Sequence, residues 1–164
     1  MIGKLVKGRG ARGLTEYLLG QRDMNGDARP RADIIGGTMA GRTPRQLAAE
    51  FGELRRLRPK LGVAVAHQSL RLSPDEPIPD DPTWRQIGDL WASEMGFQSY
   101  FVVSHGDHIH IAASRINPDG SVVSDAHDWR RSEATVRKIE QKFGLRQVES
   151  SHLLEPEKAV SHRK

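Results

Sequence analysis

Polar and apolar residues alternate in several stretches of the chain, which is the pattern of strands with one buried face. Residues 61–72 show this alternation over the greatest length and predict a long strand. Residues 2–6 and 32–37 are shorter candidate strands. Residues 100–103 and 109–116 are rich in the β-branched and aromatic side chains that strands favour. We therefore expect strands in all these segments, with the last two adjacent along the chain.

Apolar residues spaced three or four positions apart predict helices between these strands. A short helix is expected over residues 14–19, ended by Gly20. Thr43 supplies the N-cap of a second helix, with a proline at the first position and a glutamine three residues after the cap. Further helices are expected from Asp81 and from about Asp128. The stripes expected to face the core are Leu47, Phe51 and Leu54, then Trp84, Ile87, Trp91 and Met95, and finally Val136, Ile139 and Phe143.

A length of 164 residues fits one domain with a substantial core. We expect this domain to span residues 1–148 and the polar tail 149–164 to be poorly ordered, because the tail has no clear period. No stretch has the roughly 18 consecutive apolar residues of a membrane-spanning helix, and the first residues lack the apolar core of a signal peptide. The absence of cysteine excludes disulfides and thiolate metal sites. These features predict a soluble, cytoplasmic protein.

Positive charge is concentrated in the first part of the chain. Residues 1–60 hold 13 Lys and Arg against 6 Asp and Glu, a net charge of +7, whereas the whole chain has a net charge of +4. Such a basic segment predicts a surface that binds a polyanion such as DNA. A solvated face that is basic for solubility is an equally good interpretation of the charge alone.

Three of the seven histidines, His105, His108 and His110, fall within six positions. Gly106-Asp107 lies between two β-prone runs, a pattern that predicts a hairpin with a two-residue turn. In such a hairpin His105 and His108 face each other, with Cβ atoms roughly 4.5–5.5 Å apart, and His110 follows on the same face.

The three imidazoles should therefore converge, and the sequence predicts a metal site. Neutral imidazole is the commonest side-chain metal ligand, and three protein ligands leave positions open for water or substrate. With no thiolate and no added carboxylates, the site suits a divalent ion that acts as a Lewis acid. The polar face of a strand remains the alternative for a His-x-His pattern.

Helices separated by hairpin-forming strands, without a strict βαβ alternation, predict an α+β fold with a single antiparallel sheet. Helices would pack on one face of this sheet, and the three-histidine site would lie on the other. Tyr17, on the short helix after the basic glycine-rich loop, is a candidate nucleophile beside that site. A core aromatic packed beside Leu14 and Leu18 is the alternative role for Tyr17.

Several motifs in the chain occur together in one family. The basic glycine-rich loop and the Gly-Leu-Thr-Glu-Tyr-Leu sequence of residues 13–18 resemble the first motif of plasmid mobilisation relaxases, in the relaxase/mobilisation nuclease group of the His-hydrophobic-His superfamily. Residues 67–76 are similar to their second motif, with Arg71 where that motif usually has serine. The histidine cluster with Asp107 resembles the third motif, and residues 115–120 and 137–145 are similar to segments that follow it.

The resemblance implies a DNA relaxase, a strand transferase that nicks single-stranded DNA at an origin of transfer to initiate conjugative plasmid transfer. Tyr17 would attack the phosphodiester, giving a 5′-phosphotyrosine intermediate and a free 3′-OH. His105, His108 and His110 would hold one Mg²⁺ or Mn²⁺ ion. The resemblance also implies that accessory transfer proteins could be partners. Such relaxases often carry additional C-terminal domains.

Other residues would have to support this chemistry. A phenol loses its proton only well above neutral pH, so a tyrosine nucleophile needs a proton acceptor or a nearby cation. Asp107 and His67 are the candidate acceptors, although His67 could equally be a histidine of the sheet with no catalytic role. Arg9, Arg12 and Arg71 are candidate contacts to DNA phosphates, a role that suits the planar guanidinium.

Three other functions remain open from the sequence. A metal-dependent hydrolase could act on phosphate esters through metal-bound water, with Tyr17 only a core residue. A non-catalytic DNA-binding module could use the histidines to hold a structural ion. A rolling-circle replication initiator would share the relaxase chemistry and differ in its biological role. A covalent protein–DNA adduct is expected only from the tyrosine route.

Overall fold

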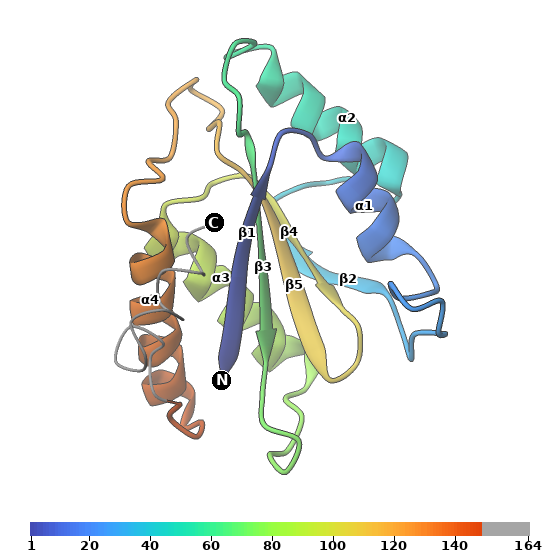
Figure 1. Ribbon diagram of the computed structural model, residues 1–164, viewed down its shortest axis with the longest axis vertical. Coiled ribbons are helices and arrows are strands. Elements are labelled where there is room, and N and C mark those ends of the chain that lie inside the picture. The colour runs from blue at the N-terminus through green and yellow to red at the C-terminus, as the bar shows by residue number, and fades with distance from the viewer. Residues whose placement is uncertain (149–164) are drawn as a thin grey trace.

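The chain folds around one five-stranded antiparallel sheet with the strand order β1-β3-β5-β4-β2 (Figure 1). The computed structural model describes residues 1–148, and the predicted tail 149–164 lies outside the described residues. The strands are β1 (Ile2–Gly8), β2 (Asp33–Gly37), β3 (Val65–Arg71), β4 (Tyr100–Ser104) and β5 (His108–Ser114). The helices are α1 (Arg12–Leu19), α2 (Pro44–Arg55), α3 (Asp81–Met95) and α4 (Asp128–Phe143).

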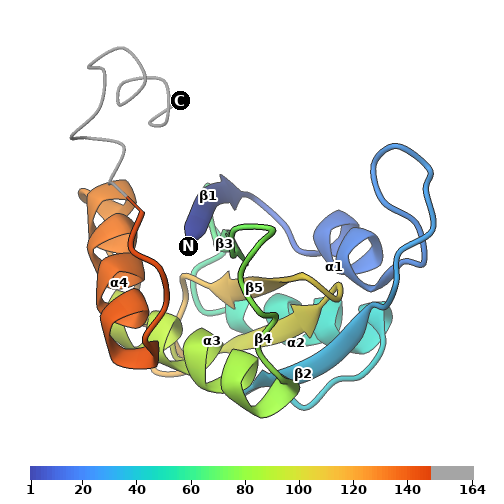
Figure 2. The same ribbon diagram turned by 90° about the horizontal axis from the view of Figure 1, so that it is seen from below.

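The predicted α+β class with a single antiparallel sheet is confirmed. On one face, the stripes of α3 and α4 pack against alternate residues of the central strands, including Ile109 and Ile111. The histidines lie on the opposite face, as expected. That face is not free of helices, however, because α1 and α2 also pack on it. Figure 2 shows α3 and α4 on one side of the sheet and α1 on the other.

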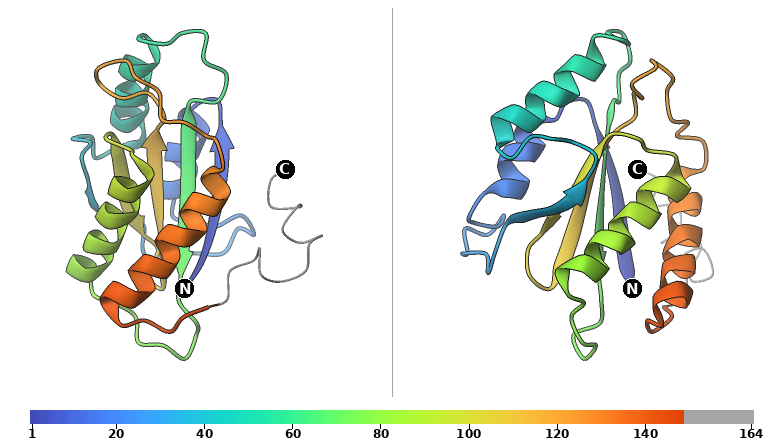
Figure 3. Two further views of the ribbon diagram at one scale, coloured as in Figure 1. Left: turned by 90° about the vertical axis from the view of Figure 1, so that its left-hand side faces the viewer. Right: turned by 180° about the vertical axis from the view of Figure 1, so that it is seen from behind.

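A second apolar cluster explains why α1 and α2 pack beside the histidines. Leu18 of α1 and Leu47 and Phe51 of α2 are buried against the sheet. The Phe51 ring meets Phe101 of β4 edge to face, with ring centroids 6.4 Å apart. β4 is thus apolar on both faces, with Val102 in the first cluster and Phe101 and Val103 in the second, and both faces need a covering layer. In the right-hand view of Figure 3, α3 and α4 lie in front of the strands, whereas α1 and α2 lie together at the upper left.

Two element boundaries differ from the sequence prediction. The long strand expected over residues 61–72 begins only at Val65. The residues before it turn, because Leu61 N–H donates to Arg58 O at 3.1 Å, and Val63 O accepts from Arg115 at 2.6 Å instead of from a strand partner. The first helix begins at Arg12, two residues earlier than expected. The Thr43 cap is confirmed, since its side chain accepts from Gln46 N–H.

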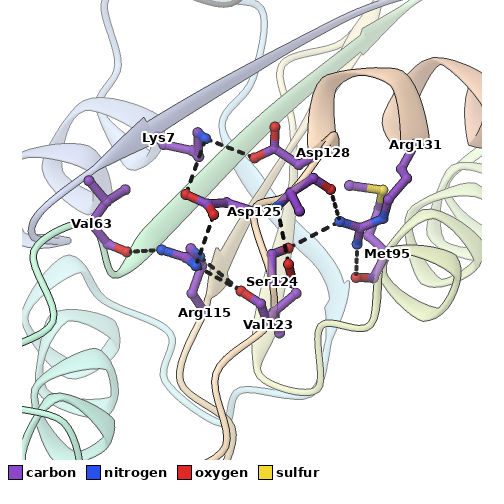
Figure 4. Close-up of polar contacts among 10 residues, drawn as sticks. Lys7, Val63, Met95, Arg115, Val123, Ser124, Asp125, Asp128 and Arg131 are labelled. Atoms are coloured by element: carbon purple, nitrogen blue, oxygen red, sulfur yellow. Dashed lines mark hydrogen bonds and ion pairs between the residues drawn. The ribbon is translucent and has the colours of Figure 1, made fainter.

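Arg115 holds the chain together where β5 ends, as Figure 4 shows. The residue is 7% exposed, and its side chain donates to the backbone carbonyls of Val63 and Val123. Asp125 lies 3.8 Å from Arg115 and 3.7 Å from Lys7, so the loop before α4 is joined to β1 as well. This network fixes the loop after β5 at the end of the sheet opposite the histidine hairpin.

The polar segment between α1 and β2 has more structure than the expected loop. It folds back on itself through a bridge between Arg22 and Ala28. The Asp23 carboxylate accepts from two backbone N–H groups of the turn, at 2.9 and 3.0 Å. At its base, Arg31 forms a bidentate pair with Asp81 at the start of α3, at 2.8 and 2.9 Å. These contacts therefore fix the position of the segment beside the sheet.

Candidate active site

The histidine hairpin has the geometry that its sequence predicts. His105 N–H donates to His108 O at 3.0 Å, which leaves Gly106 and Asp107 as the two residues of the turn. Gly106 has φ of +105°, a conformation that residues with a Cβ rarely adopt. The pairing continues with Ser104 opposite Ile109, so the histidines project to one face and Ile109 to the other. The turn and the register together gather the three rings.

The three histidines could hold a metal ion. Their candidate ligand nitrogens all lie within 4.8 Å of one another. His105 is 2% exposed and His110 is 8% exposed, whereas His108 is half-buried at the rim. The cluster thus lies at the bottom of a recess and opens toward solvent on the His108 side.

The hydrogen bonds of the rings determine which nitrogens remain free. His105 Nε2 lies 2.7 Å from Leu18 O, and a carbonyl can only accept, so Nε2 carries the proton and Nδ1 is free. His108 Nδ1 lies 2.7 Å from the Asp107 carboxylate, which leaves its Nε2 free. Arg71 lies 3.1 Å from the same Nδ1, but the shorter contact to the carboxylate sets the tautomer.

His67 completes this arrangement from the neighbouring strand. Its Nε2 lies 2.7 Å from His110 Nδ1, so a proton on Nδ1 leaves His110 Nε2 free. Each of the three histidines therefore has one ring nitrogen engaged by the protein and one available. This is the usual arrangement of metal-binding histidines, whose second nitrogen is held by an outer partner. The donor set fits a divalent ion.

Burial keeps the rings neutral. It lowers the pKa of His105 and of His67 to about 4 each, and that of His110 to about 2, because the imidazolium ion loses hydration. Burial also lowers the pKa of His108, although the hydrogen bond to Asp107 opposes this shift. Neutral imidazoles keep the lone pairs that a metal ion needs.

Tyr17 and the histidine cluster line the same open groove, which has a volume of about 500 Å³. The helix that carries Tyr17 is attached to the cluster, since the carbonyl of the next residue, Leu18, accepts from His105. The Tyr17 ring is half-buried and also packs against the edge of the second apolar cluster. Tyr17 therefore packs in part as a core aromatic while it lines the groove.

The other tyrosine is placed differently. Tyr100 is 7% exposed, and its hydroxyl donates to Asp89 at 2.6 Å on the α3 side of the sheet. Burial and the Asp89 carboxylate raise the pKa of Tyr100. Its hydroxyl is thus both occupied and on the opposite face from the histidines.

The remaining predicted site residues divide into two groups. Asp107 and Arg71 line the groove and pair with each other at 3.1 Å, and the hydrogen bond from His108 lowers the pKa of Asp107. His67 lies behind His110 and does not line the groove. Arg9 and Arg12 are not at the groove either. They line a separate hollow at the start of α1.

Arg29 is a groove residue that the sequence analysis missed. Its guanidinium carbon lies 4.6 Å from the centroid of the Tyr17 ring, within the range of a cation–π contact. Its Nη1 also donates to Tyr17 O at 2.6 Å and Gly20 O at 2.9 Å, which caps the end of α1. An arginine in a polar loop gave no pattern that could reveal this contact, which depends on how the loop folds back.

Comparison with known proteins identifies the family of the chain. The family model described as "Relaxase: MobA/VirD2-like, nuclease domain" matches residues 17–145. Because this match covers most of the sequence, the chain belongs to that family, and this supports a DNA-nicking nuclease with DNA as its substrate. No curated protein and no solved structure matches the chain. Among residues 1–148, no helix has the length and apolarity needed to cross a bilayer.

Replacing His67 with alanine should weaken metal binding by roughly 10–100-fold, because His110 would lose the partner that orients its ring. Titration with Mn²⁺ followed by electron paramagnetic resonance would measure the affinity directly. His67→Gln should retain most of it, since the amide oxygen can accept from His110 Nδ1. His127→Ala, which removes a histidine outside the cluster, is the matched control. Unchanged affinity in His67→Ala would contradict the orienting role.

Proposed function

We propose that residues 1–148 form a relaxase catalytic domain that nicks single-stranded DNA at an origin of transfer and thereby initiates conjugative plasmid transfer in the cytoplasm. Tyr17 is the nucleophile. His105, His108 and His110 hold one divalent ion, Mg²⁺ or Mn²⁺. Accessory transfer proteins would be its partners in delivering the DNA.

The reaction exchanges one phosphate ester for another. The Tyr17 hydroxyl gives up its proton, its oxygen forms a bond to phosphorus, and the bond from phosphorus to the 3′ oxygen breaks. The 3′ oxygen takes up a proton and leaves as a free 3′-OH, while the 5′ phosphate remains on Tyr17. When bound, the divalent ion stabilises negative charge on the phosphoryl oxygens. Because one ester replaces another, the step is reversible and needs no ATP.

The observation that carries this proposal is the shared groove of Tyr17 and the histidine cluster. The hydrogen bond between His105 and Leu18 O ties the nucleophile's helix to the ligands at 2.7 Å. A phosphate placed over the cluster would therefore lie beside the tyrosine ring. Arg71 at the rim has the planar guanidinium that suits a phosphate contact.

Asp107 and His67 are both hydrogen-bonded to histidines of the cluster, and we assign both an orienting role. Of the two, Asp107 alone lines the groove, so it is the candidate acceptor for the Tyr17 proton. Arg29 holds the Tyr17 ring and places a positive charge beside the groove. These groups supply positioning and electrostatic stabilisation, the main contributions to phosphoryl transfer.

The proposal predicts a covalent adduct of a defined polarity. The protein should be incubated with Mn²⁺ and single-stranded DNA from the neighbouring transfer origin, labelled in turn at each end. On a denaturing gel the fragment on the 3′ side of the nick should migrate with the protein, and the other fragment should migrate freely. Two free fragments would favour a metal-dependent hydrolase. Bound but uncut DNA would favour a DNA-binding module.

A further inference from the structure

A second hollow, of about 400 Å³, lies on the same face of the sheet as the histidine cluster. It is formed where the loop after β1 meets α2 and the ends of β3 and β5. Its volume falls in the range of small-molecule sites, roughly 300–1,000 Å³. None of the groove's lining residues lines this hollow, so the two are separate features of one surface.

The inner part of the hollow is apolar. Phe51, Val65 and Ile116 form its floor, and all three are buried in the second apolar cluster. Ala48 and Gly52 lie on the side of α2 that faces the hollow, and their lack of bulk leaves the space open. A Cβ added at Gly52 would meet no atom within 4 Å. A flat apolar group could therefore enter beside Phe51.

The rim is strongly positive. Arg9, Arg12 and Arg55 line the hollow, and no acidic residue does. Nη1 of Arg55 is buried and has no hydrogen-bond partner among the described residues. Buried charged donors are normally paired, because leaving one unpaired is costly. The hollow thus combines an apolar floor with a donor that lacks an acceptor.

We propose that this hollow binds one nucleotide of the DNA strand that is cut in the groove, with its base on the Phe51 floor and a phosphate on the arginines. Both halves of a nucleotide are matched, because bases stack on aromatic and guanidinium faces and phosphates pair with arginine. The inference rests on the proposed function, because that function supplies the DNA strand. It assigns Arg9, Arg12 and Arg55 to the binding of a phosphate of that strand.

Strand geometry gives the distance between the two sites. Ser114 lines the hollow and His110 belongs to the cluster, and they lie four positions apart on the same face of β5. At about 3.3 Å per residue they are separated by about 13 Å. This corresponds to about four nucleotides at the rise of ~3.4 Å per nucleotide of duplex DNA, and to fewer in an extended strand. The bound nucleotide would thus lie about two to four positions from the scissile phosphate.

The test is an abasic scan. An oligonucleotide from the transfer origin is made with one base removed at each position in turn, and its affinity for the protein is measured without divalent metal. With the unaltered protein, removing the base at one position two to four nucleotides from the nick should weaken binding of the oligonucleotide by about 10-fold. Gly52→Leu fills the hollow, so in that variant removing the same base should no longer change the affinity. Ala49→Leu, on α2 but outside the hollow, should retain the loss.

Arg55→Met tests the phosphate contact, because it removes the charge and keeps the length of the side chain. The slope of log K against log salt should become shallower by about 0.7 per lost contact. The proposal is overturned if no abasic position is coupled to Gly52→Leu, or if Gly52→Leu changes the oligomeric state instead. The covalent adduct, measured on the same samples, tests the proposed function separately. If the adduct forms but Gly52→Leu does not alter the effect of any abasic position, only the nucleotide site is refuted.

Discussion

Replacing Tyr17 with phenylalanine is expected to abolish DNA cleavage and leave DNA binding nearly unchanged. The substitution removes one oxygen and retains the ring, so the packing of residue 17 against the second apolar cluster and its contact with Arg29 should survive. Phenylalanine offers no atom that can attack phosphorus. Loss of a nucleophile typically costs on the order of 10⁴-fold in rate or more. The measurement is a denaturing gel with end-labelled single-stranded DNA, beside a binding isotherm on the same samples.

Tyr100→Phe is the matched control for this experiment. Its hydroxyl is bonded to Asp89 on the opposite face of the sheet, so cleavage should continue at close to the original rate. A melting curve for each variant would show whether either substitution alters folding. Full cleavage by Tyr17→Phe would exclude the tyrosine route and leave metal-bound water as the nucleophile.

The histidine site could be predicted from sequence because its geometry is local. A glycine-containing two-residue turn between β-prone runs fixes the register, and the register alone places His105, His108 and His110 on one face. The helices could be predicted for a similar reason, since Thr43 and the apolar stripes act within a few residues of each other. Features that a short segment determines by itself are the ones that the sequence reveals.

Contacts between distant segments could not be predicted in the same way. His67 meets His110 only because β3 pairs with β5, and Arg29 meets Tyr17 only because the loop before β2 folds back onto α1. The covering of the histidine face by α1 and α2 follows from Phe101 and Val103, whose burial on that face depends on the whole sheet. The sequence put Arg9, Arg12 and Arg71 together as candidate phosphate contacts, whereas the fold places Arg71 at the groove and the other two at a separate hollow.

Replacing His110 with alanine is expected to have the second large effect, on metal binding first and on cleavage as a consequence. His110 is the central ring of the cluster, with His105 and His108 at centroid distances of 4.6 and 4.9 Å. Removing it leaves two ligands and deprives His67 of its partner. Because losing an outer partner of a ligand already costs roughly 10–100-fold in metal affinity, losing the ligand itself should cost about 100-fold or more.

Cleavage by His110→Ala at a fixed Mn²⁺ concentration should fall by at least about 100-fold, the usual cost of one electrostatic contact to a reacting phosphate or carbonyl. DNA binding without metal should persist, because Arg71 and the basic residues near α1 are untouched. His127→Ala removes a histidine at the start of α4, outside the cluster, and should affect neither quantity. Electron paramagnetic resonance of bound Mn²⁺ measures the affinity independently of activity. If His110→Ala binds Mn²⁺ as tightly as the unaltered protein, the three histidines are not the ligands, and the groove must orient the phosphate by its arginines alone.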